Sequence, residues 1–179
     1  GYFLMVEGGR IDHAHHAGNA RRALGETIEL SNAVRVAREL TDADETLIVV
    51  TADHSHTFTI SGYPKRGNPI LGLVVGSSGE SPLGTTPAPD LTGHPYTTLG
   101  YANGPGYVGA SDAQPEGPKR LPHFAKRYRA PKLGRPDLSD VDTESSLYLQ
   151  EATLPLASET HGGEDVPVYA GGPSAALFH

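Results

Sequence analysis

The chain has 179 residues, enough for one domain with a hydrophobic core; 37% of them are hydrophobic and 20% are charged. A net charge of −7 disfavours nucleic-acid binding, which depends on clustered lysine and arginine, and the one basic stretch, 119–135, is interleaved with prolines. No apolar run approaches the about 18 residues of a transmembrane helix, and the absence of cysteine excludes disulfides and thiolate metal ligands.

The first third of the chain predicts a strand, a helix and a second strand. The apolar run 2–6 is typical of a buried strand. Residues 19–40 carry apolar side chains at helical spacing, and either Asn19 or the glycine before it is placed to begin the helix. The β-branched run 46–53, which ends at Asp53, predicts the second strand. This order favours a βαβ unit with a parallel sheet, and therefore an α/β fold.

Residues 63–155 have a different character. Glycine and proline are dense, helical periodicity is weak, and strand-like pieces such as "ILGLVV" and "YTTLGYA" lie between turn signals. We expect a loop-rich insertion of low helix content here, between core segments 1–62 and 156–179. Within the second core segment, "DVPVYAGGP" has the alternation of a strand that ends at a turn.

Carboxylates and imidazoles gather in the segments next to the predicted strands. Ligands bind at the carboxyl ends of parallel strands, where Glu7 would follow the first strand and Asp53 and His54 the second. Asp12 and His16 would share one face of a helical turn. Carboxylate and imidazole ligands without thiolate suit a catalytic zinc ion or another divalent cation. The alternative is a solvated loop that is rich in histidine.

Four blocks of the sequence together resemble the alkaline phosphatases, closest to the animal-type branch. The blocks are "GYFLMVEGGRIDHAHHAGNA", "TLIVVTADHSHTFTISGYPKRGNPILG", "YANGPGY" and "ETHGGEDVPVYAGGP", and they follow the family's order. The resemblance covers residues 1–108 and 155–179 and corresponds to the C-terminal portion of the family. It implies a three-layer α/β sandwich with a central, mostly parallel sheet, in which 63–155 corresponds to an irregular, crown-like insertion.

The resemblance also implies an activity. It implies a phosphomonoester hydrolase with two zinc ions and one magnesium ion, acting through a phosphoserine intermediate. A homodimer and an extracellular or periplasmic location are implied in the same way. The family's nucleophilic serine, its phosphate-binding arginine and one shared aspartate have no counterpart in this chain, so we assign no catalytic residue. We expect the chain to be part of a longer protein and to be inactive alone.

The resemblance assigns metal ligands residue by residue. They are Glu7 for magnesium, Asp12, His16 and His161 for the first zinc, and Asp53 and His54 for the second zinc.

Two further residues match positions near the metals. His56 matches a histidine that hydrogen-bonds a ligating carboxylate and so orients it. Tyr63 matches a tyrosine that, in the animal enzymes, reaches toward the active site of the partner subunit.

Two alternatives remain open at this point. One is another member of the same metal-dependent superfamily, such as a phosphodiesterase or a sulfatase, although "ETHGGED" and "TADHSH" resemble those enzymes less. The other is a non-catalytic module for zinc binding or dimerisation. The family's nucleophile block, or its absence, would distinguish the enzyme from the module.

Overall fold

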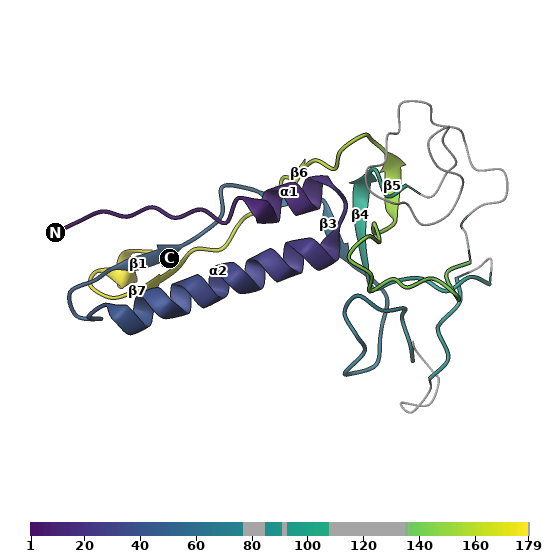
Figure 1. Cartoon of the computed structure of the whole chain (residues 1–179), viewed down its shortest axis with the longest axis horizontal. Coiled ribbons are helices and arrows are strands. Elements are labelled where there is room, and N and C mark those ends of the chain that lie inside the picture. The colour runs from purple at the N-terminus through teal and green to yellow at the C-terminus, as the bar shows by residue number, and fades with distance from the viewer. Residues whose placement is uncertain (77–84, 91–92, 108–134, 136, 179) are drawn as a thin grey trace.

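The computed structural model describes residues 1–76, 85–90, 93–107, 135 and 137–178. A long helix lies beside a two-stranded ribbon at one end of the molecule, and a three-stranded sheet lies near the other end of that helix (Figure 1). Within this described part, no helix is both long and apolar enough to cross a membrane.

Two antiparallel helices form the first part of the structure. Helix α1 spans Arg10–His16 and helix α2 spans Ala20–Leu40. Gly18 has φ +68°, a left-handed conformation in which glycine commonly ends a helix, and it allows the sharp turn between them. The Asn19 side chain then accepts a hydrogen bond from the backbone N–H of Arg22, which caps α2. The predicted helix over 19–40 is therefore confirmed.

Short strands from distant parts of the chain pair into three small sheets. β1 pairs with β7 and β2 pairs with β6, both antiparallel, while β3, β4 and β5 form a third sheet in that order. In the third sheet β3–β4 is antiparallel and β4–β5 is parallel. The bounds are β1 Ile48–Val50, β2 Ser55–His56, β3 Phe58–Ile60, β4 Leu99–Gly104, β5 Ala152–Pro155, β6 His161–Gly162 and β7 Tyr169–Gly171, followed by the 3₁₀ turn η2 Ala175–Leu177.

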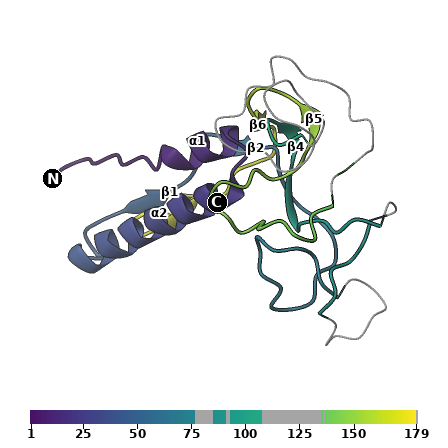
Figure 2. The ribbon, with the colours of Figure 1, turned by 45° about the vertical axis from the view of Figure 1, so that its right-hand side comes forward.

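The strand predicted over 2–6 is wrong for the structure described. The segment has no regular secondary structure, and its side chains are exposed, from 66% at Val6 to 92% at Phe3. Both ribbon views show this end of the chain extending away from the helices (Figures 1 and 2). A strand needs hydrogen-bonding partners along its backbone, and no described strand pairs with residues 2–6.

The predicted parallel βαβ pairing is also wrong for this part of the chain. The strand after α2, β1, pairs antiparallel with β7 near the C-terminal end of the sequence. β7 itself confirms the strand predicted from "DVPVYAGGP". Among the strands that the structure describes, only β4 and β5 form a parallel pair. Helices and strands nevertheless combine as expected of an α/β chain.

The expected insertion at 63–155 is described only in part. Its described residues contain no α-helix, and two of its segments form strands: β4 pairs with β3, and β5 pairs with β4. Most of the basic stretch 119–135 and the serines of "GSSGES" lie outside the described residues. The division into core and insertion stays a prediction.

Buried polar contacts join the turn between the helices to the segment before β5. The Ala20 N–H donates to Gln150 Oε1 over 2.7 Å, and the Gln150 N–H donates to the Gly18 carbonyl over 2.9 Å. The Asn19 amide donates to the Ser146 carbonyl over 2.8 Å. These bonds fix the start of α2, and with it the end of α1, against the rest of the fold.

Candidate metal centre

Helix α1 supplies a carboxylate and an imidazole from one face. Asp12 and His16 are one turn apart, and the Nε2 atom of His16 lies 3.2 Å from Oδ1 of Asp12. The carbonyl of His16 accepts a hydrogen bond from the N–H of Glu159, which docks this end of the helix against the segment before β6.

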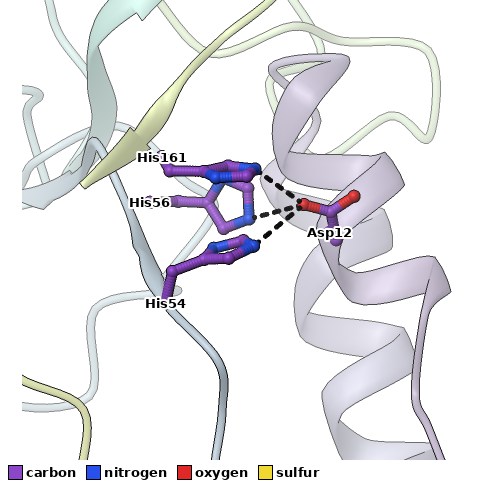
Figure 3. Close-up of side chains that lie close together, drawn as sticks. All are labelled: Asp12, His54, His56 and His161. Carbon is purple, nitrogen blue, oxygen red and sulfur yellow. Dashed lines mark ion pairs between the residues drawn. The ribbon is translucent and has the colours of Figure 1, made fainter. Parts of the chain in front are cut away.

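Strands β2 and β6 and the residue just before β2 supply three more imidazoles. His56 lies directly opposite His161 in the antiparallel pair. His54 lies two residues before His56, so the extended backbone turns both rings to the same side. Figure 3 shows these three rings pointing at Asp12. Around Asp12 Oδ1, the Nε2 atoms lie at 3.2 Å for His56, 3.4 Å for His161 and 3.9 Å for His54.

The hydrogen bonds at Nδ1 determine what three of these rings offer at Nε2. The Nδ1 atom of His16 lies 2.6 Å from the Glu159 carbonyl, and that of His54 lies 3.1 Å from the Ser55 carbonyl. A carbonyl can only accept, so Nδ1 carries the proton in both rings. The Nδ1 atom of His56 lies 2.7 Å from Glu159 Oε2, so an ionised carboxylate requires the same arrangement. Neutral rings of this kind present a lone pair at Nε2.

When its imidazoles are neutral, the centre gathers lone pairs around a carboxylate and supplies no positive charge of its own. Asp12 Oδ1 is buried and has no hydrogen-bond donor, and the Nε2 atoms of His16 and His161 lie only 3.2 Å apart. Among the described residues, no lysine or arginine pairs with Asp12. A divalent cation would accept the lone pairs of Asp12 Oδ1 and of the neighbouring Nε2 atoms. Asp12, His54, His56 and His161 form one group that could hold an ion, and His16, His56 and Glu159 form a second.

Glu159 is a site residue that the sequence prediction missed. Its side chain is fully buried, and its carboxylate contacts His56 and Thr57. It lies two residues before His161 in "ETHGGED", so the alternation of an extended segment was the available signal.

His15 lies beside the cluster, but it is not one of the rings that point at Asp12. Its ring stacks on that of His56, and its Nδ1 atom lies 2.8 Å from the Tyr101 hydroxyl. Burial, reinforced by the neighbouring His56, lowers the pKa of His15 to about 4. Burial also raises the pKa of Tyr101, so both partners stay neutral at physiological pH. His15 thus packs the back of the centre as an uncharged ring.

Three predicted site residues do not join the cluster in the described structure. Glu7 is exposed on the extended N-terminal segment. The Asp53 carboxylate lies 3.5 Å from the Nε2 atom of His54, but its side chain is 89% exposed. Tyr63 is 79% exposed. The predicted roles of these residues, and of the clustered ones, stay predictions.

Comparison with known proteins identifies the family. The family model "Alkaline phosphatase" matches residues 1–179. The chain belongs to the alkaline phosphatase family. Among its relatives, a tissue-nonspecific alkaline phosphatase isozyme from Gallus gallus is 45% identical, and its counterpart from Homo sapiens is 42% identical. An alkaline phosphatase from Gadus morhua is 41% identical. Each match covers 100% of this chain.

The alkaline phosphatase relatives are much longer than this chain. The chain spans 28% of the Gallus gallus and Homo sapiens proteins and 31% of the Gadus morhua protein. Membership of the alkaline phosphatase family implies that family's α/β fold, and the clustered imidazoles and carboxylates are candidate ligands for its metals.

Proposed function

We propose that this chain is the metal-binding part of a zinc- and magnesium-dependent phosphomonoester hydrolase. The observation that carries the proposal is the convergence of imidazole Nε2 atoms on the buried, donor-free Oδ1 of Asp12. A carboxylate in this setting needs a cation, and the family to which the chain belongs is one of phosphatases.

The resemblance to the family supplies the proposed roles of the residues. Two divalent cations held about 4 Å apart would stabilise the attacking and leaving oxygens of a phosphate monoester. Asp12, His16 and His161 are the proposed ligands of the first zinc. The distances support this set, since Asp12 Oδ1 and the two Nε2 atoms lie 3.2–3.4 Å from one another. The β1–β2 connection would provide Asp53 and His54 for the second zinc.

The remaining parts of the proposal concern the whole protein. Glu7 would bind magnesium, and Tyr63 would reach the partner subunit of a homodimer with an extracellular or periplasmic location. The nucleophilic serine, which would form the phosphoserine intermediate, belongs to a part of the family fold that this chain does not span. We therefore expect zinc binding by the isolated chain without phosphomonoester hydrolysis.

Metal analysis of the purified chain tests the metal centre, and hydrolysis of p-nitrophenyl phosphate at alkaline pH tests for turnover. We expect bound zinc in the native chain and a loss of zinc in His161→Ala, with the fold kept in circular dichroism. His13→Ala is the matched control, because His13 lies on α1 but is exposed and outside the cluster. Absence of zinc from the native chain, or unchanged zinc in His161→Ala, would contradict the assignment.

A chimaera separates the phosphatase from its alternatives. This chain would replace the matching 28% of the Gallus gallus relative, whose remaining part would supply the rest of the family fold. We expect hydrolysis of phosphate monoesters in preference to phosphate diesters and sulfate esters. Preference for a diester or a sulfate ester would favour the other superfamily members. A folded chimaera that binds zinc without turnover would favour a non-catalytic module.

A further inference from the structure

Glu159 contacts two of the imidazoles at the metal centre through different chemical groups. We infer that Glu159 is the positioning residue that keeps the Nδ1 proton on both His16 and His56, so that both Nε2 atoms face Asp12 as lone pairs. For His56 this makes Nε2 a candidate ligand atom, in place of the expected hydrogen-bond donor to a carboxylate. This inference rests on the proposed metal centre and adds a residue to it.

The first contact runs through the backbone and is reciprocal. The Nδ1–H of His16 donates to the Glu159 carbonyl over 2.6 Å. In return, the Glu159 N–H donates to the His16 carbonyl over 3.0 Å. Because a backbone carbonyl cannot donate, this pair of bonds fixes both the tautomer and the orientation of the His16 ring.

The second contact runs through the buried carboxylate. Oε2 accepts from His56 Nδ1 over 2.7 Å. Oε1 accepts from the Thr57 backbone N–H over 2.6 Å and from the Thr57 hydroxyl over 2.7 Å. A backbone N–H can only donate, so the oxygen that faces Thr57 has to be an acceptor. The other oxygen faces His56, and in the ionised carboxylate it accepts from Nδ1 and holds the proton there.

This arrangement makes the Glu159→Gln substitution informative. The Thr57 N–H would draw the amide oxygen to the Oε1 position, which leaves the amide NH₂ facing His56. The amide would then donate to Nδ1 of His56, and a neutral ring would carry its proton at Nε2 instead. The backbone contact to His16 would be unchanged. The carboxylate oxygen Oε2 also lies 3.8 Å from His16 Nδ1, so the substitution changes the charge near both rings. It changes the hydrogen-bond partner of His56 alone, and the proton position of His16 is therefore the internal control.

Nitrogen NMR of the metal-free native chain at alkaline pH tests the inference without any variant. We expect the proton at Nδ1 in both His16 and His56. A proton at Nε2 in either ring would overturn the inference. This measurement does not depend on zinc, so the inference and the proposed function can fail separately.

The variant supplies the second test. In Glu159→Gln we expect the His56 proton to move to Nε2, the His16 proton to stay, and zinc affinity to fall by about 10–100-fold in competition with a chromophoric chelator. Glu164→Gln is the matched control, because Glu164 hydrogen-bonds Ser55 on the same strand pair and contacts no ring of the centre. We expect unchanged zinc affinity there. Native affinity and an unmoved His56 proton in Glu159→Gln would overturn the inference, whereas a native chain that binds no zinc would overturn the proposed function alone.

Discussion

Two carboxylate centres in this molecule have neighbours of different kinds. At the first, Asp12 Oδ1 faces only imidazole nitrogens and has no hydrogen-bond donor. At the second, Arg135 reaches two acids: its guanidinium lies 2.5 Å from Asp90 Oδ2 and 2.6 Å from Glu151 Oε2. The same guanidinium also donates to the Pro95 carbonyl over 3.1 Å.

The difference shows how a binding centre can be told from a structural ion pair. Arg135 supplies the positive charge that its carboxylates need, so that centre is complete within the fold. Asp12 has no arginine or lysine partner among the described residues, and neutral imidazoles around it offer lone pairs instead of protons. A cluster whose carboxylates are neutralised by an arginine or lysine of the same chain stabilises the structure. A cluster of carboxylates without such a cation is a candidate for binding a metal ion.

The largest effect is expected from Asp12→Asn, which removes the charge at the first centre. We expect zinc affinity to fall by more than the about 10–100-fold that is typical for residues that only orient a ligand. Chelator competition measures the change. Asp140→Asn, at an exposed position away from the cluster, should bind zinc as the native chain does. Native affinity in Asp12→Asn would exclude this carboxylate as a ligand.

The second centre should respond in stability and not in zinc binding. Arg135→Met leaves Asp90 and Glu151 without their shared guanidinium, and we expect a loss of about 2 kcal/mol in the free energy of unfolding. This is below the about 3–5 kcal/mol of a fully buried pair, because the Arg135 side chain is 26% exposed and partly screened. Urea unfolding measures the loss. Weaker zinc binding in this variant would show that the two centres are coupled.

An exposed ion pair provides the comparison for that variant. Arg35 and Glu39 form a pair on α2 with side chains 61% and 58% exposed. Arg35→Met should lower the free energy of unfolding by only about 0.3–0.5 kcal/mol, the usual contribution of such helical pairs.

Close packing at β6 gives the next prediction. A Cβ atom at Gly162 would contact Glu164 Oε2 and Ser55 Oγ and would lie 2.8 Å from the His56 carbonyl. The two side chains can rotate away, but the carbonyl belongs to β2. We expect Gly162→Ala to destabilise by about 1 kcal/mol, at the low end for overpacking, and to weaken zinc binding by shifting His161. Gly163→Ala has open space and should change neither quantity.

The smallest effect is a pH dependence at the second centre. Burial raises the pKa of Glu151, and Arg135 opposes that rise. Without Arg135 the pKa should rise further. A carboxyl with a raised pKa in the folded state stabilises the fold below its ordinary value, 4.5 for Glu151, and loses that contribution as the pH rises through the folded value.

The instability of Arg135→Met should therefore be greatest at neutral pH and should shrink as the pH falls toward 4.5. Urea unfolding of both chains across this range measures the difference between them. A difference that grows on acidification would contradict the assigned role of Glu151.

Local signals in the sequence predicted the elements that depend on local contacts. The spacing of apolar residues predicted α2, which is confirmed. Of the two possible starts, Asn19 and the glycine before it, the structure has Asn19 as the cap. The short alternation before a glycine turn predicted β7. The run 2–6 has the composition of a strand, but composition does not supply a partner, and the described chain leaves the segment unpaired.

The site was predictable where residues are close in sequence. Asp12 and His16 share a helix face, and His54 and His56 share a side of an extended segment, so short spacing brings each pair together. Glu159 contacts His16 and His56 across 143 and 103 residues of sequence. Such contacts depend on how the segments pack in three dimensions. The alternation in "ETHGGED" relates Glu159 to His161 but does not indicate which distant rings it contacts.

The bonds between Gln150 and the turn before α2 have a consequence for local unfolding. The Ala20 N–H donates to the Gln150 side chain, and the Gln150 N–H donates to the Gly18 carbonyl, so neither bond can open without disturbing the other segment. These two amides, 130 residues apart, should exchange with solvent in one cooperative event. The first turn of α2 and residues 148–150, which precede β5, would thus open and close as one unit. Helix α1, with Asp12 and His16, would move with that unit.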